Sequence, residues 1–160
     1  MTQSITAPAQ DRRLSPRAYF SALVMICTIS LGWMVFVELD RGLFLGTLGL
    51  IQHVSYIALV LLGSIGILVG SAVKRGRLVM IIATLCTLAL LANFIFASLQ
   101  FGGEMGWWNG PVSQIRQASA MQFSESTWTL LGLSLAGWNG TIALVLGVVS
   151  LATLLRWSRD

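Results

Sequence analysis

Residues 48–99 read LGLIQHVSYIALVLLGSIGILVGSAVKRGRLVMIIATLCTLALLANFIFASL, two long apolar runs separated by the basic turn Lys74-Arg75-Gly76-Arg77. Each run is long enough to cross a bilayer as a helix, because the hydrocarbon core is roughly 30 Å thick and takes about 20 helical residues. The turn is too short for the second run to cross in the same direction as the first, so the two helices must be antiparallel. This stretch therefore predicts a transmembrane helical hairpin.

Two further apolar runs flank this hairpin, and the composition of the whole chain agrees with four membrane crossings. Of the 160 residues, 56% are hydrophobic and 10% are charged, whereas roughly a quarter of the residues in a soluble domain are charged. The runs lack the alternation of barrel strands, which favours helices. We predict an all-α membrane protein with a flexible N-terminal tail at 1–17 and a four-transmembrane-helix antiparallel bundle at 18–157, its spans near 18–37, 48–73, 78–99 and 129–155.

The net charge of +4 reflects membrane topology, and no nucleic-acid partner is expected. Arginines precede the first span, the turn at 74–77 is basic, and two more arginines follow the last span. All of these positions lie on one side of the membrane if the spans alternate. By the positive-inside rule that side is the cytoplasm, so both termini are expected to be cytoplasmic. Glu38 and Asp40 then fall in the first outer turn, where we expect them to be solvated or paired with Arg41.

The longest segment between spans, at about 100–128, has the pattern of a surface helix. Pro111 suits the first turn of a helix, and behind it apolar residues recur at every third position: Val112, Ile115, Ala118 and Met121. This pattern predicts a short interfacial helix over 111–122, lying on the outer membrane surface in the second outer loop, which is periplasmic in a bacterial cell.

The two cysteines, Cys27 and Cys86, lie near the middle of the first and third spans. A thiol in hydrocarbon keeps its proton and packs as a small apolar group, so neither is expected to be a nucleophile. A disulfide between them would require the two helices to face each other at that depth. Gly66 and Gly70 form a G-x-x-x-G step, which lets helix backbones approach closely. We interpret this step as packing inside the bundle rather than as a dimerisation face.

Polar residues inside the predicted spans lie at about one level of the outer leaflet: Gln52, His53, Tyr56 and Asn93. Polar groups in hydrocarbon are costly and therefore point to function. These side chains have the chemistry to hydrogen-bond the carbonyl of a lipid-soluble ligand such as a quinone. Hydrogen bonding between helices is the simpler interpretation, and the frequency of such bonds favours it. His53 is the only histidine and has no cysteine or carboxylate cluster beside it, so no metal site is expected.

Two short motifs are similar to those of the disulfide bond formation protein B (DsbB) family, whose members are four-helix inner-membrane enzymes that pass electrons from periplasmic thiols to a bound quinone. Residues 46–53, GTLGLIQH, match the family pattern C-P-L-C-[LI]-I-Q-R, with Gly46 and Gly49 in place of both cysteines and His53 in place of the arginine near the quinone. Residues 125–140, ESTWTLLGLSLAGWNG, resemble the family pattern W-x-[FL]-L-G-L-S-x-x-x-W. The resemblance implies the family's fold in a bacterial inner membrane.

The departures from the family pattern imply a change of function. Thiol–disulfide exchange requires a thiolate that attacks a disulfide sulfur, and both cysteines of this chain lie within spans. We expect a non-catalytic DsbB-like protein in the lipid bilayer, an accessory or structural subunit that joins other membrane-protein subunits in a respiratory or photosynthetic electron-transfer complex. One alternative is a quinone-binding protein with a retained pocket near His53, and another is a disulfide oxidoreductase that uses Cys27 and Cys86.

Overall fold

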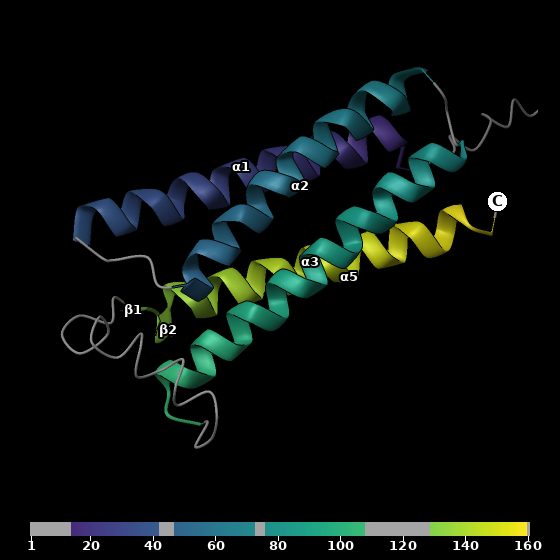
Figure 1. The fold of residues 1–160 in the computed structure, drawn as a ribbon. Helices are drawn as coiled ribbons and strands as arrows, with labels where there is room; N and C mark the ends of the chain where they lie inside the picture. The colour runs from purple at the N-terminus through teal and green to yellow at the C-terminus, as the bar shows by residue number, and fades with distance from the viewer. Residues whose placement is uncertain (1–13, 42–46, 73–75, 108–128, 160) are drawn as a thin grey trace, which may run out of the picture.

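In the computed structural model, residues 14–41, 47–72, 76–107 and 129–159 are described. They form long helices and one short hairpin, in the order α1 (Pro16–Arg41), α2 (Thr47–Ala72), α3 (Arg77–Glu104), β1 (Thr129–Leu130), β2 (Leu133–Ser134) and α5 (Leu135–Trp157) (Figure 1). All four of these helices are long and apolar enough to cross a membrane, which confirms the predicted four-helix membrane fold. The predicted surface helix at 111–122 and residues 1–13 of the predicted tail lie outside the described residues.

Serine side chains mark the start of two helices. Ser15 Oγ accepts a hydrogen bond from the N–H of Ala18 at 3.2 Å, ahead of α1. Ser134 Oγ accepts one from the N–H of Gly137 at 3.2 Å, at the start of α5. Each bond satisfies a backbone N–H that the first turn of a helix leaves without an intrahelical partner. These caps place the first residues of the first and last spans.

The helices form two antiparallel pairs that lie side by side (Figure 1). α1 packs along α2, α3 packs along α5, and the two pairs meet through α2 and α3, whereas α1 and α5 have little contact with each other. Side chains on α2 can therefore face either its own partner α1 or the second pair. The direction in which each α2 side chain points therefore decides which helices surround the polar residues near the start of α2.

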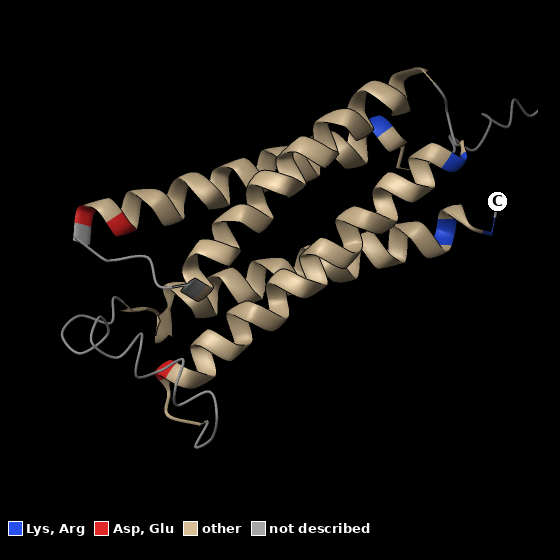
Figure 2. Ribbon diagram, in the orientation of Figure 1, with Lys and Arg blue, Asp and Glu red and all other residues tan. Residues whose placement is uncertain are grey.

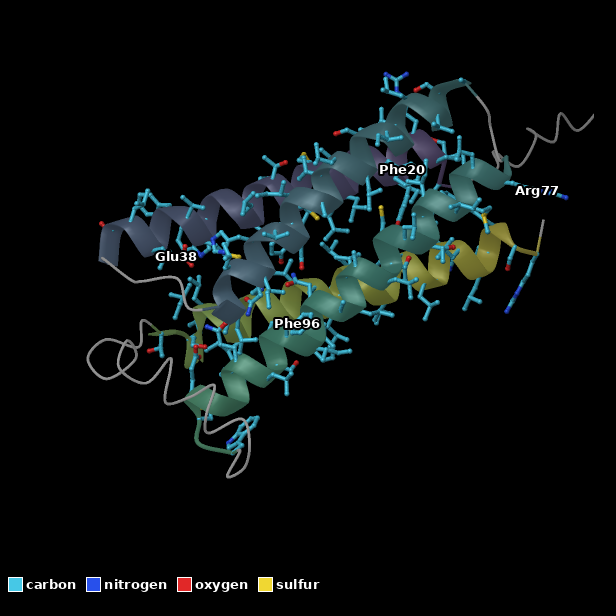
Figure 3. All side chains as sticks on the ribbon, viewed as in Figure 1. Phe20, Glu38, Arg77 and Phe96 are labelled. Carbon is cyan, nitrogen blue, oxygen red and sulfur yellow. The ribbon has the colours of Figure 1, made fainter. Side chains whose placement is uncertain are left out.

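The glycines of α2 allow α1 to pack closely against it. A Cβ at Gly66 would lie 2.5 Å from Phe20 Cδ1, and one at Gly63 would lie 2.6 Å from Val24 Cγ2. Gly70 lies against Pro16, where a Cβ would be 3.1 Å from the proline Cβ. Figure 3 shows the Phe20 side chain in this region, where α1 and α2 lie close together. The interpretation of Gly66 and Gly70 as packing positions inside the bundle is confirmed.

Both cysteines belong to the buried core. Cys27 and Cys86 are fully buried free thiols, in an apolar cluster to which all four described long helices contribute. Near them the hydroxyl of Tyr19 on α1 donates to Ser150 Oγ of α5 at 2.9 Å. Small apolar or paired polar groups thus fill the centre of the bundle, which agrees with a packing role for the cysteines.

Apart from Arg41, the last residue of α1, the charged residues of the described chain separate to opposite ends of the bundle (Figure 2). One end, the basic end, carries the cations Arg17, Arg77, Arg156 and Arg159. The other, the acidic end, carries Glu38, Asp40 and Glu104. The first turns of α2 and α5 and the β1–β2 hairpin are at the acidic end, so the residues matching the two family patterns lie there.

Candidate functional site

The predicted site residues are all buried near the acidic end, but they face different neighbours. Gln52, His53 and Tyr56 lie on α2 and Asn93 lies on α3. His53 contacts α1. Gln52 contacts both α3 and α5, and Asn93 contacts α5. The structure therefore places His53 in a histidine–carboxylate pair and Gln52 and Asn93 in a chain of amides, whereas Tyr56 belongs to neither.

The histidine–carboxylate pair joins α1 to α2. His53 Nδ1 lies 2.8 Å from the carbonyl oxygen of Gly49, and because a carbonyl only accepts, Nδ1 must carry a hydrogen. His53 Nε2 lies 3.1 Å from Glu38 Oε2, without the alignment of a hydrogen bond. The two side chains therefore face each other across the contact between α1 and α2.

This pairing corrects the expectation that Glu38 is solvated, whereas the alternative of a pair with Arg41 lies outside the described side chains. Glu38 lies within α1, which continues to Arg41, and its side chain is mostly shielded from solvent against α2. Figure 3 shows Glu38 near the acidic end of α1. The physical reason is the length of the helix: because α1 continues beyond the predicted end at residue 37, Glu38 is held in a helical turn beside His53 rather than released into a loop.

The amide chain links α2, α3 and α5 through hydrogen bonds that all run in one direction. The amide nitrogen of Asn93 donates to Asn139 Oδ1 at 3.4 Å, and that of Asn139 donates to Gln52 Oε1. The amide nitrogen of Gln52 donates to Gln100 Oε1 at 2.8 Å, and that of Gln100 donates to Glu104 Oε1 at 3.1 Å. Bonds aligned in this way polarise one another and strengthen the chain.

Sequence reasoning missed three members of this chain: Gln100, Glu104 and Asn139. Gln100 lies one residue beyond the predicted end of the third span, and Asn139 lies in the fourth span. The sequence signal for Gln100 and Asn139 was their depth in the membrane, since each lies toward the outer end of its span, as Gln52 does. Depth alone leaves the rotation of each helix open, so it does not say which side chains meet.

Four buried polar side-chain atoms have no hydrogen-bond partner among the described residues: His53 Nε2, Glu104 Oε2, the hydroxyl of Tyr56 and Oδ1 of Asn93. The last two come from different helices, Tyr56 from α2 and Asn93 from α3. Both residues have no exposed surface. Ser30 of α1 and Asn93 of α3 are the polar side chains beside the Tyr56 hydroxyl. The end of the amide chain therefore brings an unused acceptor and an unused hydroxyl to the same region between α1, α2 and α3.

The second family-like motif forms the entry to α5. Leu131 and Gly132 are the turn of the β1–β2 hairpin, with φ of 54° and 81°, and Ser134 caps the helix. The indole N–H of Trp138 donates to the carbonyl oxygen of Leu130 at 2.9 Å. Each described member of the motif thus has a structural task in joining the hairpin to the last span.

The first family-like motif forms the entry to α2, and Gly46 lies outside the described residues. Gly49 is in the first turn of α2, where its carbonyl oxygen accepts from His53. The chain has only two cysteines, and both lie in the buried core. Within the described ranges no cluster of three metal-ligating side chains occurs.

Comparison with known proteins gives one match. The family model for the disulfide bond formation protein DsbB matches residues 16–153, which includes all four described long helices almost completely. No curated protein matches the chain, and no solved structure does.

Proposed function

Since the chain belongs to the DsbB family of membrane proteins, we propose that it is a non-catalytic member, an accessory or structural subunit of a larger electron-transfer complex. The observation that carries the proposal is the amide chain at the acidic end. Gln52, from the family-like motif, uses both polar atoms of its side chain on Asn139 and Gln100. Gln52, which lies close to the position of the family's second cysteine, thus holds helices together, as we expect of a bundle whose role is structural.

The position of the thiols supports a non-catalytic role. Disulfide exchange requires a thiolate that reaches the disulfide of a partner protein. Cys27 and Cys86 are fully buried in the core, and apolar surroundings favour the protonated, unreactive thiol. The positions of the family's first cysteine pair hold Gly46 and Gly49. A disulfide oxidoreductase is therefore the least favoured function.

The proposed setting is a bacterial inner membrane with both termini in the cytoplasm. Arginines gather at the basic end of the bundle, where both termini of the described chain lie, and acidic residues gather at the other end (Figure 2). Positive charge is retained on the cytoplasmic side of such membranes. The large apolar side chains exposed along α1 and α5, which have little contact with each other, offer faces for lipid and for neighbouring subunits.

Purification from the native membrane tests the accessory role. A tagged chain extracted in a mild detergent is expected to co-migrate with other membrane subunits in native gels, and mass spectrometry identifies them. An untagged strain controls for adhering proteins. If the chain runs alone in several mild detergents, the accessory role is refuted.

A thiol-oxidation assay tests the absence of catalysis. Reduced protein thiols and a quinone are expected to react no faster with the purified chain than without it. Oxidation by the unmodified chain that is lost on Cys27→Ser or Cys86→Ser would instead establish a disulfide oxidoreductase.

A second proposal is quinone binding near His53, and the unpaired hydroxyl of Tyr56 favours it. A buried hydroxyl without a partner among the described residues can donate to a quinone carbonyl oxygen. Lipid extracts of the purified chain are then expected to contain about one quinone per chain, with less after Tyr56→Phe or His53→Ala. Tyr19→Phe is the matched control, because the Tyr19 hydroxyl is already bonded to Ser150. Equal quinone in all variants would exclude this site.

A further inference from the structure

The turn of the β1–β2 hairpin has an unusual residue at its tip. Leu131 has a φ of 54°, and among the described residues it is the one non-glycine residue with positive φ. Two-residue hairpin turns with positive φ at both positions favour Asn-Gly, because asparagine and glycine tolerate this conformation and leucine does not. The Leu131 side chain is also 86% exposed. An apolar side chain thus occupies a strained, exposed position, and packing within the described chain does not explain it.

The residues around the tip are uncharged, like nearly all those of the membrane span that follows. Every residue from Thr129 to Leu155 is uncharged, so the hairpin and α5 form one uninterrupted uncharged segment. Leu130 is exposed beside the tip, and so are Val145 and other large apolar residues along α5. A hairpin meant for water would interrupt this series with polar turn residues.

Part of the hairpin backbone is paired within the structure, which lowers the cost of contact with the acyl boundary. Leu130 pairs with Leu133 and Thr129 pairs with Ser134 across the two strands. The carbonyl oxygen of Leu130 accepts in addition from the indole of Trp138. Tryptophan side chains are favoured where hydrocarbon meets the headgroups, which places this bond at the depth of the interface.

We propose that the hairpin is a membrane anchor, with its tip inserted at the acyl boundary of the leaflet on the acidic side and Leu131 in contact with lipid. Lipid is the occupant that the structure favours, because the hairpin leads directly into α5, whose exposed apolar side chains already face the bilayer. Figure 1 shows the hairpin at the end of the bundle where α5 begins. This inference is independent of the proposed accessory or quinone-binding role.

Spin labelling in lipid vesicles tests the anchor. A nitroxide is attached to Leu131→Cys, and to Leu130→Cys as a second reporter in case the first variant folds poorly. Val145→Cys, exposed in the middle of α5, is the lipid-facing control, and Ser158→Cys, exposed beyond the end of α5, is the water-facing control. The unmodified chain is the blank, because its two thiols are buried.

The readout is the ratio of nitroxide collisions with oxygen, which concentrates in hydrocarbon, to collisions with a water-soluble nickel chelate. The labels at Leu131 and Leu130 are expected to give ratios several-fold above that at Ser158 and approaching that at Val145. Ratios equal to the Ser158 value would overturn the proposal by placing the tip in water. Labels that neither reagent reaches would also overturn it, because protein rather than lipid would then cover the tip.

Discussion

Replacing Gly66 by alanine puts a methyl group into space that the ring of Phe20 fills. The new Cβ would lie 2.5 Å from Cδ1 and 2.6 Å from Cε1 and Cγ, whereas carbon atoms pack at about 3.5–4.0 Å. Phe20 is fully buried, and Cγ lies next to the backbone, so rotation of the ring does not relieve the contact. α1 must move away from α2.

The expected cost follows from two opposing effects. Overpacking a buried site costs about 1–3 kcal/mol, and replacing a helical glycine by alanine gains up to about 1 kcal/mol. Gly66→Ala is therefore expected to destabilise the bundle by up to about 2 kcal/mol. Gly32→Ala is the matched control, because no heavy atom lies within 4 Å of its new Cβ, and it is expected to be neutral or stabilising by up to about 1 kcal/mol.

Reversible unfolding in mixed detergent–SDS micelles, followed by far-ultraviolet circular dichroism, measures both variants. Phe20→Leu, alone and combined with Gly66→Ala, completes a double-mutant cycle, in which the smaller side chain is expected to reduce the cost of the alanine by more than about 0.5 kcal/mol. Equal stability of the Gly66→Ala and Gly32→Ala variants would refute the close approach of α1 and α2 on which this prediction rests.

The same unfolding assay checks three further predictions. Asn139→Leu removes the hydrogen-bond partner of Asn93 Nδ2 and of Gln52 Oε1 and is expected to cost about 1–3 kcal/mol. The exposed control Ser64→Ala is expected to cost less than about 0.5 kcal/mol, and equal effects would contradict the amide chain. Glu38→Gln is expected to change stability by less than about 0.5 kcal/mol, because the new amide can donate to His53 Nε2, whereas Glu38→Ala costs about 1–2 kcal/mol. A larger loss for glutamine than for alanine would contradict the contact between Glu38 and His53. Ser134→Ala removes a helix cap and is expected to cost about 1 kcal/mol, and no loss would show that the cap is dispensable.

The number and course of the spans could be predicted because a bilayer restricts the choices. Backbone polar groups in hydrocarbon must be satisfied within the segment, so a long apolar run can only be a helix. The role of Gly66 followed similarly, since a small residue in such a run allows close packing wherever a neighbour is present. Hydropathy is less informative at the ends of spans, where helices continue into the interface. The extra turn of α1 that brings Glu38 to His53 lies in that zone.

The partners of the polar residues could not be derived from the sequence for a related reason. Hydropathy reports depth but not the rotation of a helix about its axis, and rotation decides that Gln52 faces Asn139 while the next residue, His53, faces Glu38. The hairpin before α5 was likewise included in the fourth span. Its turn is Leu131-Gly132, which lacks the polar residue that usually marks such a turn.

The amide chain also has a consequence for how the protein is made. Gln52 enters the membrane with the second helix, but one of its partners is on α3 and the other is on α5, which leaves the ribosome after the other described helices. During synthesis its side chain therefore stays without the Asn139 bond until α5 has been inserted. The bond between Gln52 and Asn139, which joins the α1–α2 pair to the α3–α5 pair, is thus among the last contacts that the described helices can form.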